Sequence, residues 1–259
     1  MTLYAKPSLL FLVALTLLTS RVEAQPNCSL KTLKGAYLYG ATGLKDKVLP
    51  FVPPGENGQI VNLEGGQEIF DGRGNITNTY ADGSGQVTLV NGSYSLDANC
   101  VGRAVYNSGD SYTLYASPTG NEFTWASISA GKKITGREVR VSRSLSPRCS
   151  LKTLKGTYLY SHMGYRNGIP YFETGKESYD GLGHLSNVYT DMNGHAVETN
   201  GTYALNGENC VAQATYEDTG DTYIIFMAPS GSEFRYVSFD GTRSNLAVGA
   251  EHRVSKKQF

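Results

Sequence analysis

Residues 28–35 read CSLKTLKG, and residues 149–156 read the same eight letters in the same order. The match continues along the chain: Gly35-Ala-Tyr-Leu-Tyr39 is repeated as Gly156-Thr-Tyr-Leu-Tyr160. Later pairs are Phe70-Asp-Gly with Tyr179-Asp-Gly, Asn91-Gly-Ser-Tyr94 with Asn200-Gly-Thr-Tyr203, and Gly109-Asp-Ser-Tyr112 with Gly220-Asp-Thr-Tyr223. Each copy spans about 115 residues, the size of a domain rather than of a solenoid repeat. We therefore expect two tandem domains, residues 25–145 and 146–259, joined near the polar stretch SRSLSPR.

Within each copy, short runs that alternate apolar and polar residues are separated by turn signals. In the first copy the runs cover residues 35–40, 60–70, 75–81, 86–96, 101–106, 111–117, 122–129 and 134–143. Asp-Gly pairs between such runs, as at Asp71 and Asp82, are typical of hairpin turns because those turns need positive φ. The pattern predicts an all-β fold in which each copy is an antiparallel, about eight-stranded meander barrel, with a sandwich as the alternative. Closure into a barrel would remove exposed sheet edges.

The chain has four cysteines, Cys28, Cys100, Cys149 and Cys210, which can pair in three ways. If each copy folds separately, the duplication selects Cys28–Cys100 and Cys149–Cys210. Each bond would then join the start of the first strand to the turn after the fourth. The cysteines lack the Cys-x-x-Cys spacing and the nearby histidine pair of a zinc site. We expect structural disulfides, no metal and no cofactor.

The N-terminus has the pattern of a signal peptide. An apolar run at residues 8–19 follows Lys6 and leads to Val22-Glu23-Ala24, a small-residue cleavage pattern. A run this short cannot cross about 30 Å of hydrocarbon, which needs about 20 residues. We expect residues 1–24 to be removed, leaving a secreted or periplasmic protein without a membrane span, in a compartment where disulfides persist. The residues before Phe259 lack the apolar alternation expected of an outer-membrane barrel.

Charge and motifs exclude several function classes. The 23 basic and 23 acidic residues balance, so we expect no nucleic-acid partner. The chain has no P-loop, no dinucleotide-binding glycine pattern, no nucleophile elbow and no zinc-protease helix. The loop Asp71-Gly-Arg-Gly-Asn75 lacks the acidic ligands and closing glutamate of a calcium loop, so we interpret it as a turn.

Candidate catalytic residues lie at matching places in the two copies. Glu122 and Glu233 each open a strand after a Pro-x-Gly turn, whereas Tyr112 and Tyr223 follow Gly-Asp-[Ser/Thr]. A strand-start carboxylate that points into a barrel lumen would have a raised pKa suited to acid catalysis. The alternative is a solvated strand end beside an aspartate that caps its turn. Whether the protein is an enzyme stays open on this basis.

The copies also differ. The first holds a Pro-rich insertion near Lys47–Gly58, in which Phe51 and Val52 are candidate ligand contacts if the loop covers a cavity. A tolerated surface insertion is the alternative. All four histidines, His162, His184, His195 and His252, lie in the second copy without metal-site spacing. Sequons at Asn27, Asn75, Asn91 and Asn200 would carry glycans only in a eukaryotic secretory pathway.

The motifs of each copy resemble those of a class of exported bacterial proteins. They are Leu-Lys-Gly-[Ala/Thr]-Tyr after a cysteine, an [Phe/Tyr]-Asp-Gly-x-Gly turn, and Gly-[Ser/Thr]-Tyr-x-Leu before a second cysteine. The class is similar in shape to the lipocalins and allene oxide cyclase. The resemblance implies a barrel, export and a lumen able to hold an apolar or amphipathic small molecule. It carries no catalytic residue over to this chain.

Our leading hypothesis is an exported, non-enzymatic protein that binds a small apolar ligand in a barrel lumen, or acts as a surface interaction module. One alternative is a cyclase or isomerase of the allene oxide cyclase type that uses a lumen carboxylate or tyrosine. Another is a carbohydrate-binding or adhesive module with exposed tyrosines and Trp125. The expected partner is a small apolar molecule or a glycan, and the oligomeric state is left open.

Overall fold

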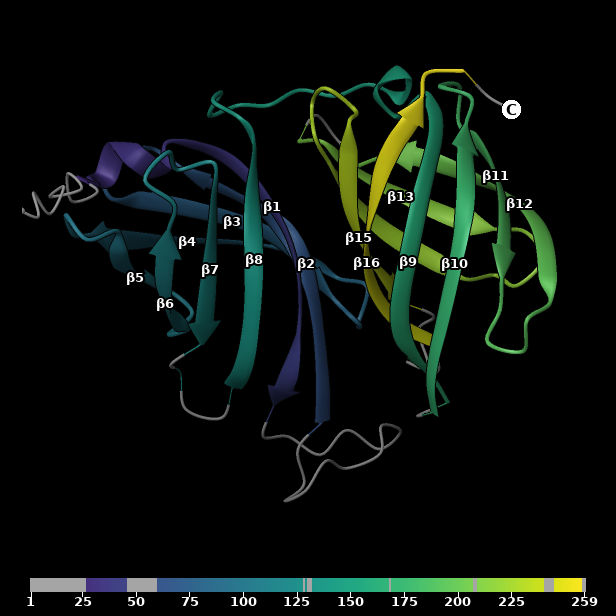
Figure 1. Cartoon of the computed structure of the whole chain (residues 1–259), viewed down its shortest axis with the longest axis horizontal. Coiled ribbons are helices and arrows are strands. Elements are labelled where there is room, and N and C mark those ends of the chain that lie inside the picture. The colour runs from purple at the N-terminus through teal and green to yellow at the C-terminus, as the bar shows by residue number, and fades with distance from the viewer. Residues whose placement is uncertain are drawn as a thin grey trace, which may run out of the picture.

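The computed structural model describes residues 27–257 except 46–59, 128, 130–131, 168, 207–208 and 240–244. The described residues form two closed antiparallel β-barrels that lie side by side (Figure 1). Barrel 1 follows the short 3-10 helix η1 (Leu30–Leu33) and comprises β1 (Gly35–Lys45), β2 (Ile60–Phe70), β3 (Asn75–Asp82), β4 (Val87–Leu96), β5 (Val101–Tyr106), β6 (Ser111–Ala116), β7 (Glu122–Ser127) and β8 (Lys132–Ser142). Barrel 2 follows η2 (Leu151–Leu154) and comprises β9 (Gly156–Arg166), β10 (Ile169–Tyr179), β11 (His184–Thr190), β12 (Ala196–Leu205), β13 (Val211–Tyr216), β14 (Thr222–Met227), β15 (Glu233–Phe239) and β16 (Asn245–Ser255).

Both barrels are meanders. Each strand pairs with the next along the chain, and β1 closes on β8 as β9 closes on β16. The predicted all-β fold with two eight-stranded barrels is therefore confirmed, and the sandwich alternative is wrong. Tight turns between alternating strands favour the meander, and closure leaves neither sheet with a free edge.

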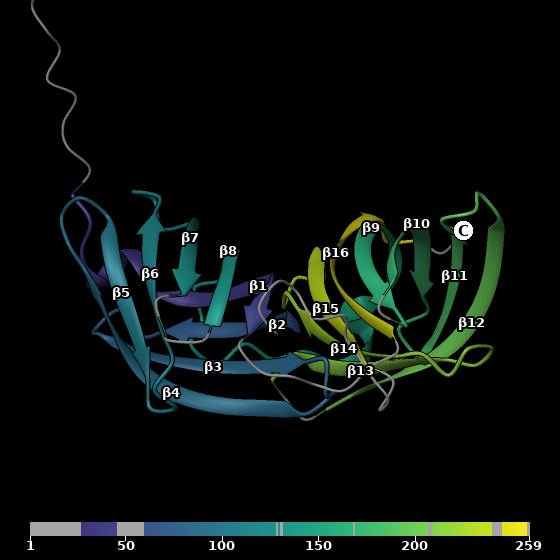
Figure 2. The same ribbon diagram turned by 90° about the horizontal axis from the view of Figure 1, so that it is seen from below.

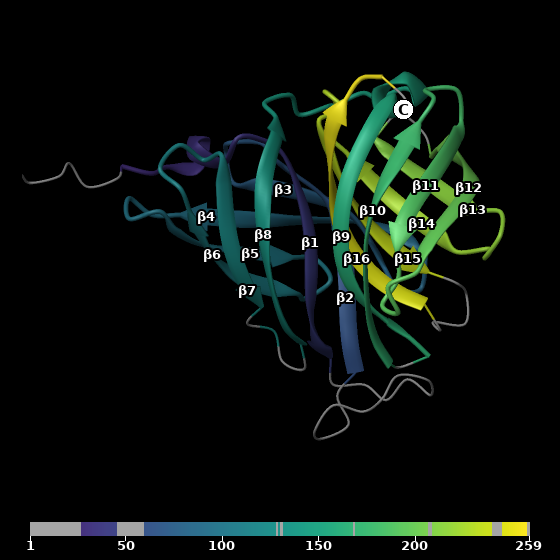
Figure 3. The same cartoon turned by 45° about the vertical axis from the view of Figure 1, so that its right-hand side comes forward.

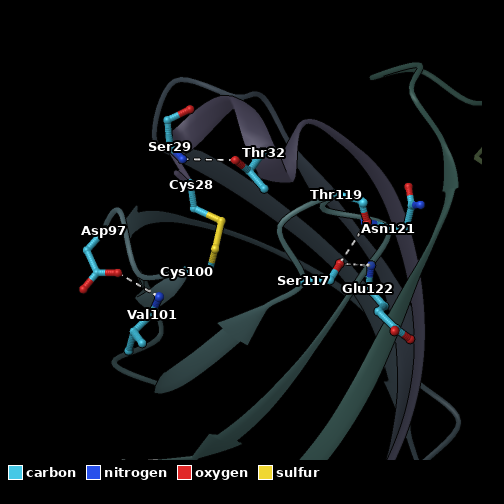
Figure 4. The surroundings of a disulfide bond; sticks show 10 residues. All are labelled: Cys28, Ser29, Thr32, Asp97, Cys100, Val101, Ser117, Thr119, Asn121 and Glu122. Carbon is cyan, nitrogen blue, oxygen red and sulfur yellow. Dashed lines mark hydrogen bonds between the residues drawn. A yellow bond between two sulfur atoms is a disulfide. The ribbon is translucent and has the colours of Figure 1, made fainter. Parts of the chain in front are cut away.

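The repeated CSLKTLKG segment closes one end of each barrel. At the start of η1 the backbone N–H of Ser29 donates to Thr32 Oγ1 at 3.0 Å (Figure 4). Leu33 at the end of η1 is fully buried. The same 3.0 Å bond joins Ser150 to Thr153 at η2. Gly35 then begins β1 at φ +135°, where an added Cβ would lie 2.3 Å from the Ser142 carbonyl oxygen. The first part of the motif thus plugs one end of the barrel, and its last residue begins the first strand.

The predicted disulfides are confirmed. Cys28 is bonded to Cys100 and Cys149 to Cys210, with Cα–Cα distances of 5.0 and 4.9 Å. Figure 4 shows the first bond, which joins Cys28, two residues before η1, to Cys100 in the turn that follows β4. Each bond holds the plug segment against its own barrel.

Aromatic side chains fill the plugged half of each lumen. In barrel 1, Phe70 makes edge-on contacts with Tyr37, Tyr94 and Phe123 at ring-centroid distances of 4.9–5.4 Å. In barrel 2, Tyr179 occupies the place of Phe70 and contacts the equivalent rings. Edge-to-face packing of this kind stabilises a core beyond the area it buries.

The two barrels share a third apolar core, which we call the seam. Leu38 on β1 and Ala81 on β3 pack there with residues of β13, β14 and the turn after β14: Val211, Ile224, Phe226 and Ala228. The two barrels come closest to each other at glycines such as Gly65. A Cβ added at Gly65 would lie 2.7 Å from Val237 Cγ2 of barrel 2. Figures 2 and 3 show the same side-by-side arrangement from below and from the right, with β1 and β2 next to β14, β15 and β16. Among the described residues, no helix is long and apolar enough to cross a membrane.

Candidate functional site

The other half of each lumen is polar and is built from the same three residues in both barrels. In barrel 1, the Tyr39 hydroxyl donates to Glu64 Oε1 at 2.9 Å and accepts from Asn78 Nδ2 at 2.9 Å. In barrel 2, Tyr160 donates to Glu173 at 3.1 Å and accepts from Asn187 at 2.9 Å. Strand alternation places these side chains inside, on the same face as the aromatic plug.

A pair of buried carboxyl groups lies beside this network in barrel 1. Glu68 on β2 accepts hydrogen bonds from Tyr106 and, at 2.6 Å, from Tyr112. Glu138 on β8 is 0% exposed and lies beside Glu68 and the Trp125 indole, but among the described residues no hydrogen bond of normal geometry reaches either of its oxygens. Burial raises the pKa of Glu68 to about 7 and raises that of Glu138 well above its ordinary value, with the neighbouring carboxyl group adding to the effect on Glu138. The pair therefore holds at least one proton at neutral pH, which can supply the donor that Glu138 lacks.

Barrel 2 repeats the carboxyl pair as Glu177 on β10 and Glu251 on β16. Tyr179 donates to Glu177 at 2.5 Å, whereas Glu251 Oε2 has no partner among the described residues. Burial raises the pKa of Glu177 to about 7 and that of Glu251 well above its ordinary value. Two neighbouring buried carboxyl groups with raised pKa values are thus a shared feature of the two lumens.

The lumens differ in their cationic and imidazole groups. In barrel 1, Lys132 Nζ lies 3.2 Å from Glu64 and 3.8 Å from Asp110. Burial opposes the charge of Lys132, but these two carboxylates outweigh it and raise its pKa. In barrel 2, His162 Nδ1 lies 2.5 Å from the Tyr236 hydroxyl, and its Nε2 lies 3.7 Å from Glu173. Burial, assisted by the charge of Arg166, lowers the pKa of His162 to about 4, so the ring is neutral at pH 7.

The cavities left in these lumens are small. The polar half of barrel 1 encloses about 30 Å³, between Tyr39, Glu64, Glu68, Trp125 and Lys132. The corresponding cavity of barrel 2 is about 10 Å³. One water molecule needs about 10–15 Å³, whereas a cavity that binds benzene is about 150 Å³. Both cavities are therefore of the size that holds one or two water molecules.

A larger hollow lies outside barrel 2. It is an open depression of about 500 Å³ over β12 and β13, lined by Thr202, Tyr203, Ala204, Leu205, Asn206, Gln213 and Thr215. Most of these side chains are small or polar, and the described lining residues include no carboxylate, cation or histidine. We assign it no chemistry.

The predicted candidate residues separate into two groups. Tyr112 and Tyr223 lie inside the lumens, where Tyr112 donates to Glu68 and Tyr223 packs edge-on against Tyr216 and Tyr236. Glu122 and Glu233 instead point away from the cavities. Glu122 forms an ion pair with Arg137 on the exposed surface.

Glu233 lies 3.1 Å from Arg235 and 3.9 Å from His252. Phe51 and Val52 fall outside the described residues. Trp125, considered above as part of an exposed patch, is buried in lumen 1 at 5% exposure.

The histidines of the second and third turns of barrel 2 lie beside aspartates. His184 and His195 lie 2.8 and 3.6 Å from the aspartates that begin their turns, Asp180 and Asp191. Asp71 accepts from the backbone N–H groups of Arg73 and Asn75, as a turn-capping aspartate does. Over the described ranges, no group of three histidine, cysteine, aspartate or glutamate residues is arranged to hold a metal ion.

Sequence reasoning missed the lumen carboxylates, although a signal was present. Glu64 and Glu68 lie four residues apart in a predicted strand, and so do Glu173 and Glu177. Strand alternation places both members of each pair on the same face as Phe70 or Tyr179. Once the aromatic residue is assigned to the core, the two glutamates must follow it inside.

No protein-family model and no curated protein matches the chain. A protein of unknown function from the DUF3598 family of Nostoc punctiforme is 11% identical with a TM-score of 0.28, over 90% of this chain and 100% of that one. A Trp-to-Ala mutant of transferrin binding protein B from Haemophilus parasuis is 10% identical with a TM-score of 0.27, over 86% and 76% of the two chains. Intact Ap-TbpB, with its N and C lobes, is 8% identical with a TM-score of 0.30, over 85% and 77%. Values this low say nothing of what the present chain binds.

Proposed function

We propose that this chain is an exported, non-enzymatic interaction protein whose two filled barrels form a scaffold and whose outer surface binds another macromolecule. The disulfides support export, because such bonds persist in oxidising compartments. The signal-peptide pattern of residues 1–24 is consistent with the same destination.

The proposal rests on a contrast between the barrel lumens and the outer surface of barrel 2. The lumens leave room for one or two water molecules each, and carboxyl groups line that room, so neither suits a small apolar ligand. Large apolar side chains instead lie on the outer surface of β9–β11, which we call the β9–β11 face: Leu159, Met163, Phe172 and Val188, at 40–63% exposure. Met163 and Phe172 lie opposite each other in the strand register, whereas Leu159 and Val188 lie on either side of Lys176. Large apolar side chains exposed together on one face indicate an interaction surface.

A fluorescent dye that binds apolar surfaces tests the proposal. Anilinonaphthalene sulfonate should bind the native protein at submicromolar concentration, where any self-association is dissociated. Met163→Ser combined with Phe172→Ser should remove most of that signal, because these side chains lie opposite each other on neighbouring strands. Tyr115→Ser, which removes a 56%-exposed side chain on barrel 1, is the matched control and should change little. Dye binding that survives the double substitution and is displaced by a fatty acid would instead indicate a lumen site.

One observation favours a second candidate, an acid–base enzyme that uses barrel 1. Glu68 has a pKa near the working range of a general acid, it is hydrogen-bonded to Tyr112, and lumen 1 is the roomier of the two. A water-soluble carbodiimide, which reacts with accessible carboxyl groups, separates this candidate from the first. Modification of Glu68 in the native protein at pH 6 would support an open active site. Modification of the exposed Glu122 without Glu68 would indicate a sealed, structural carboxyl pair.

A further inference from the structure

The same outer face is buried in barrel 1 and exposed in barrel 2. In barrel 1, Leu38 on β1 and Leu63 on β2 are 0% and 3% exposed because barrel 2 covers them. Their counterparts in barrel 2 are Leu159 on β9 and Phe172 on β10, at 49% and 61% exposure. Barrel 2 thus keeps apolar residues at positions that barrel 1 buries, without a third barrel to cover them. Figure 1 shows β9 and β10 at the front of barrel 2, beside β16.

The uncovered face cannot repeat the packing of the seam. Val248 and Val237 of barrel 2 pack onto Gly40 and Gly65, where an added Cβ would lie 3.0 and 2.7 Å from a valine methyl group. The equivalent positions of barrel 2 are Ser161 and Thr174, whose side chains fill that space. A further barrel docked in the same way would clash with them.

A head-to-tail contact would also need barrel 1 to present the surface that barrel 2 presents at the seam, and that surface differs in barrel 1. Barrel 1 carries Thr113 and Thr135 where barrel 2 contributes Ile224 and Val248 to the seam. The apolar side chains of the β9–β11 face therefore need an occupant that docks differently from the seam. Heterologous contacts that do not close would also build open chains, a risk that these substitutions remove.

Charge on the β9–β11 face is arranged for self-complementarity. Val188 on β11 lies between Lys176 on β10 and Glu198 on β12, opposite both in the strand register. Lys176 and Glu198 are thus two strands, or about 10 Å, apart within one molecule. Among the described residues neither forms an ion pair. A two-fold axis near Val188 would bring Lys176 of one molecule to Glu198 of another.

We propose that the β9–β11 face is a two-fold interface with a second copy of this chain. The interface would cover Leu159, Met163, Phe172 and Val188 and would pair Lys176 with Glu198 of the second copy. It would also be continuous with the seam, because Met163 lies opposite Val248, which packs there beside Leu246. This inference rests on the proposed interaction function and names its partner.

Sedimentation velocity on the purified, disulfide-bonded protein tests the proposal across micromolar to submillimolar concentrations. We expect a concentration-dependent dimer that Phe172→Ser abolishes, with Met163→Gln as a second variant of the same face. Both side chains are more than half exposed, so the melting temperature should not change. Tyr115→Ser is the control on barrel 1 and should leave the dimer intact. Lys176→Glu should weaken the dimer at least tenfold, and adding Glu198→Lys should restore it.

A monomer at every concentration would overturn the proposal, as would a dimer that persists in Phe172→Ser. Failure of the charge-reversed double variant to restore a dimer that Lys176→Glu had broken would overturn the two-fold pairing. These results differ from failure of the interaction function itself. A monomer whose β9–β11 face still binds the apolar dye would keep that function and point to a different protein as the occupant.

Discussion

Ala41 on β1 and His162 on β9 occupy the same position in the two repeats, and both are buried. A second exchange lies two strands away, where Trp125 on β7 of barrel 1 corresponds to Tyr236 on β15 of barrel 2. The large indole packs over Gly136 beside a small alanine, whereas the tyrosine shares its space with the imidazole, at 2.5 Å from Nδ1. One scaffold therefore encloses the same carboxyl pair in two different electrostatic settings, and the two barrels should respond differently to pH.

Barrel 1 should be more stable in mild acid than at pH 8. Because Glu68 has a native pKa of about 7 against an ordinary value of 4.5, the native state holds a proton that the unfolded chain releases between these values. Stability is then fully present below about pH 4.5 and is lost as the pH rises through 7, by an amount on the order of 3 kcal/mol. Thermal melts followed through Trp125, the single tryptophan, report on barrel 1.

Glu68→Gln should make this pH profile shallower, because it removes one of the two buried carboxyl groups whose ionisation barrel 1 opposes. Glu122→Gln, on the exposed surface, is the matched control and should keep the wild-type slope. An unchanged profile in Glu68→Gln would show that the carboxyl pair does not govern the acid stability.

Below pH 6.5, the stability of barrel 2 should depend less on pH than the stability of barrel 1 does. Burial lowers the pKa of His162 from 6.5 to about 4, so its contribution is present above pH 6.5 and is lost as the pH falls through 4. This trend opposes that of Glu177, whose raised pKa favours the native state in acid. His162→Ala, which copies barrel 1, should uncover the slope of Glu177. Hydrogen exchange of β9–β16 peptides at pH 5 and pH 6.5 measures how the stability of barrel 2 changes with pH. Equal changes in the wild type and in His162→Ala would contradict the opposing effect assigned to His162.

The sequence predicts the fold well for a physical reason. Turn glycines, alternation and paired cysteines are local signals, and the duplication removes the ambiguity in cysteine pairing. The candidate site is predicted less well because a strand-start residue such as Glu122 lies where the alternation is about to begin. A shift of one residue in the expected start of the strand changes whether such a side chain points inward or outward. The seam is not readable either, since Gly40 and Gly65 resemble ordinary strand glycines until a second barrel packs on them.

Each disulfide should stabilise its own barrel. Closing a loop of 72 or 61 residues in the unfolded chain contributes about 4 kcal/mol in the chain-entropy model. Replacing Cys28 and Cys100 by serine should therefore lower the midpoint of the Trp125 transition in a denaturant titration. The matched pair Cys149→Ser and Cys210→Ser should affect that transition less, because it acts on barrel 2. Equal shifts from the two pairs would mean that the barrels unfold as one cooperative unit.

Gly65 should be a point at which the two barrels can be separated. In Gly65→Val the new side chain meets Val237 of the other barrel, since even its Cβ would lie 2.7 Å from a valine methyl group. Overpacking of this kind costs about 1–3 kcal/mol, and moving the barrels apart relieves it without disturbing either lumen. We expect a larger radius of gyration by small-angle scattering, with both barrels still folded. Thr174→Val, at the equivalent exposed position of barrel 2, is the matched control and should leave the scattering of the monomer unchanged. An unchanged radius in Gly65→Val would contradict the close packing assigned to the seam.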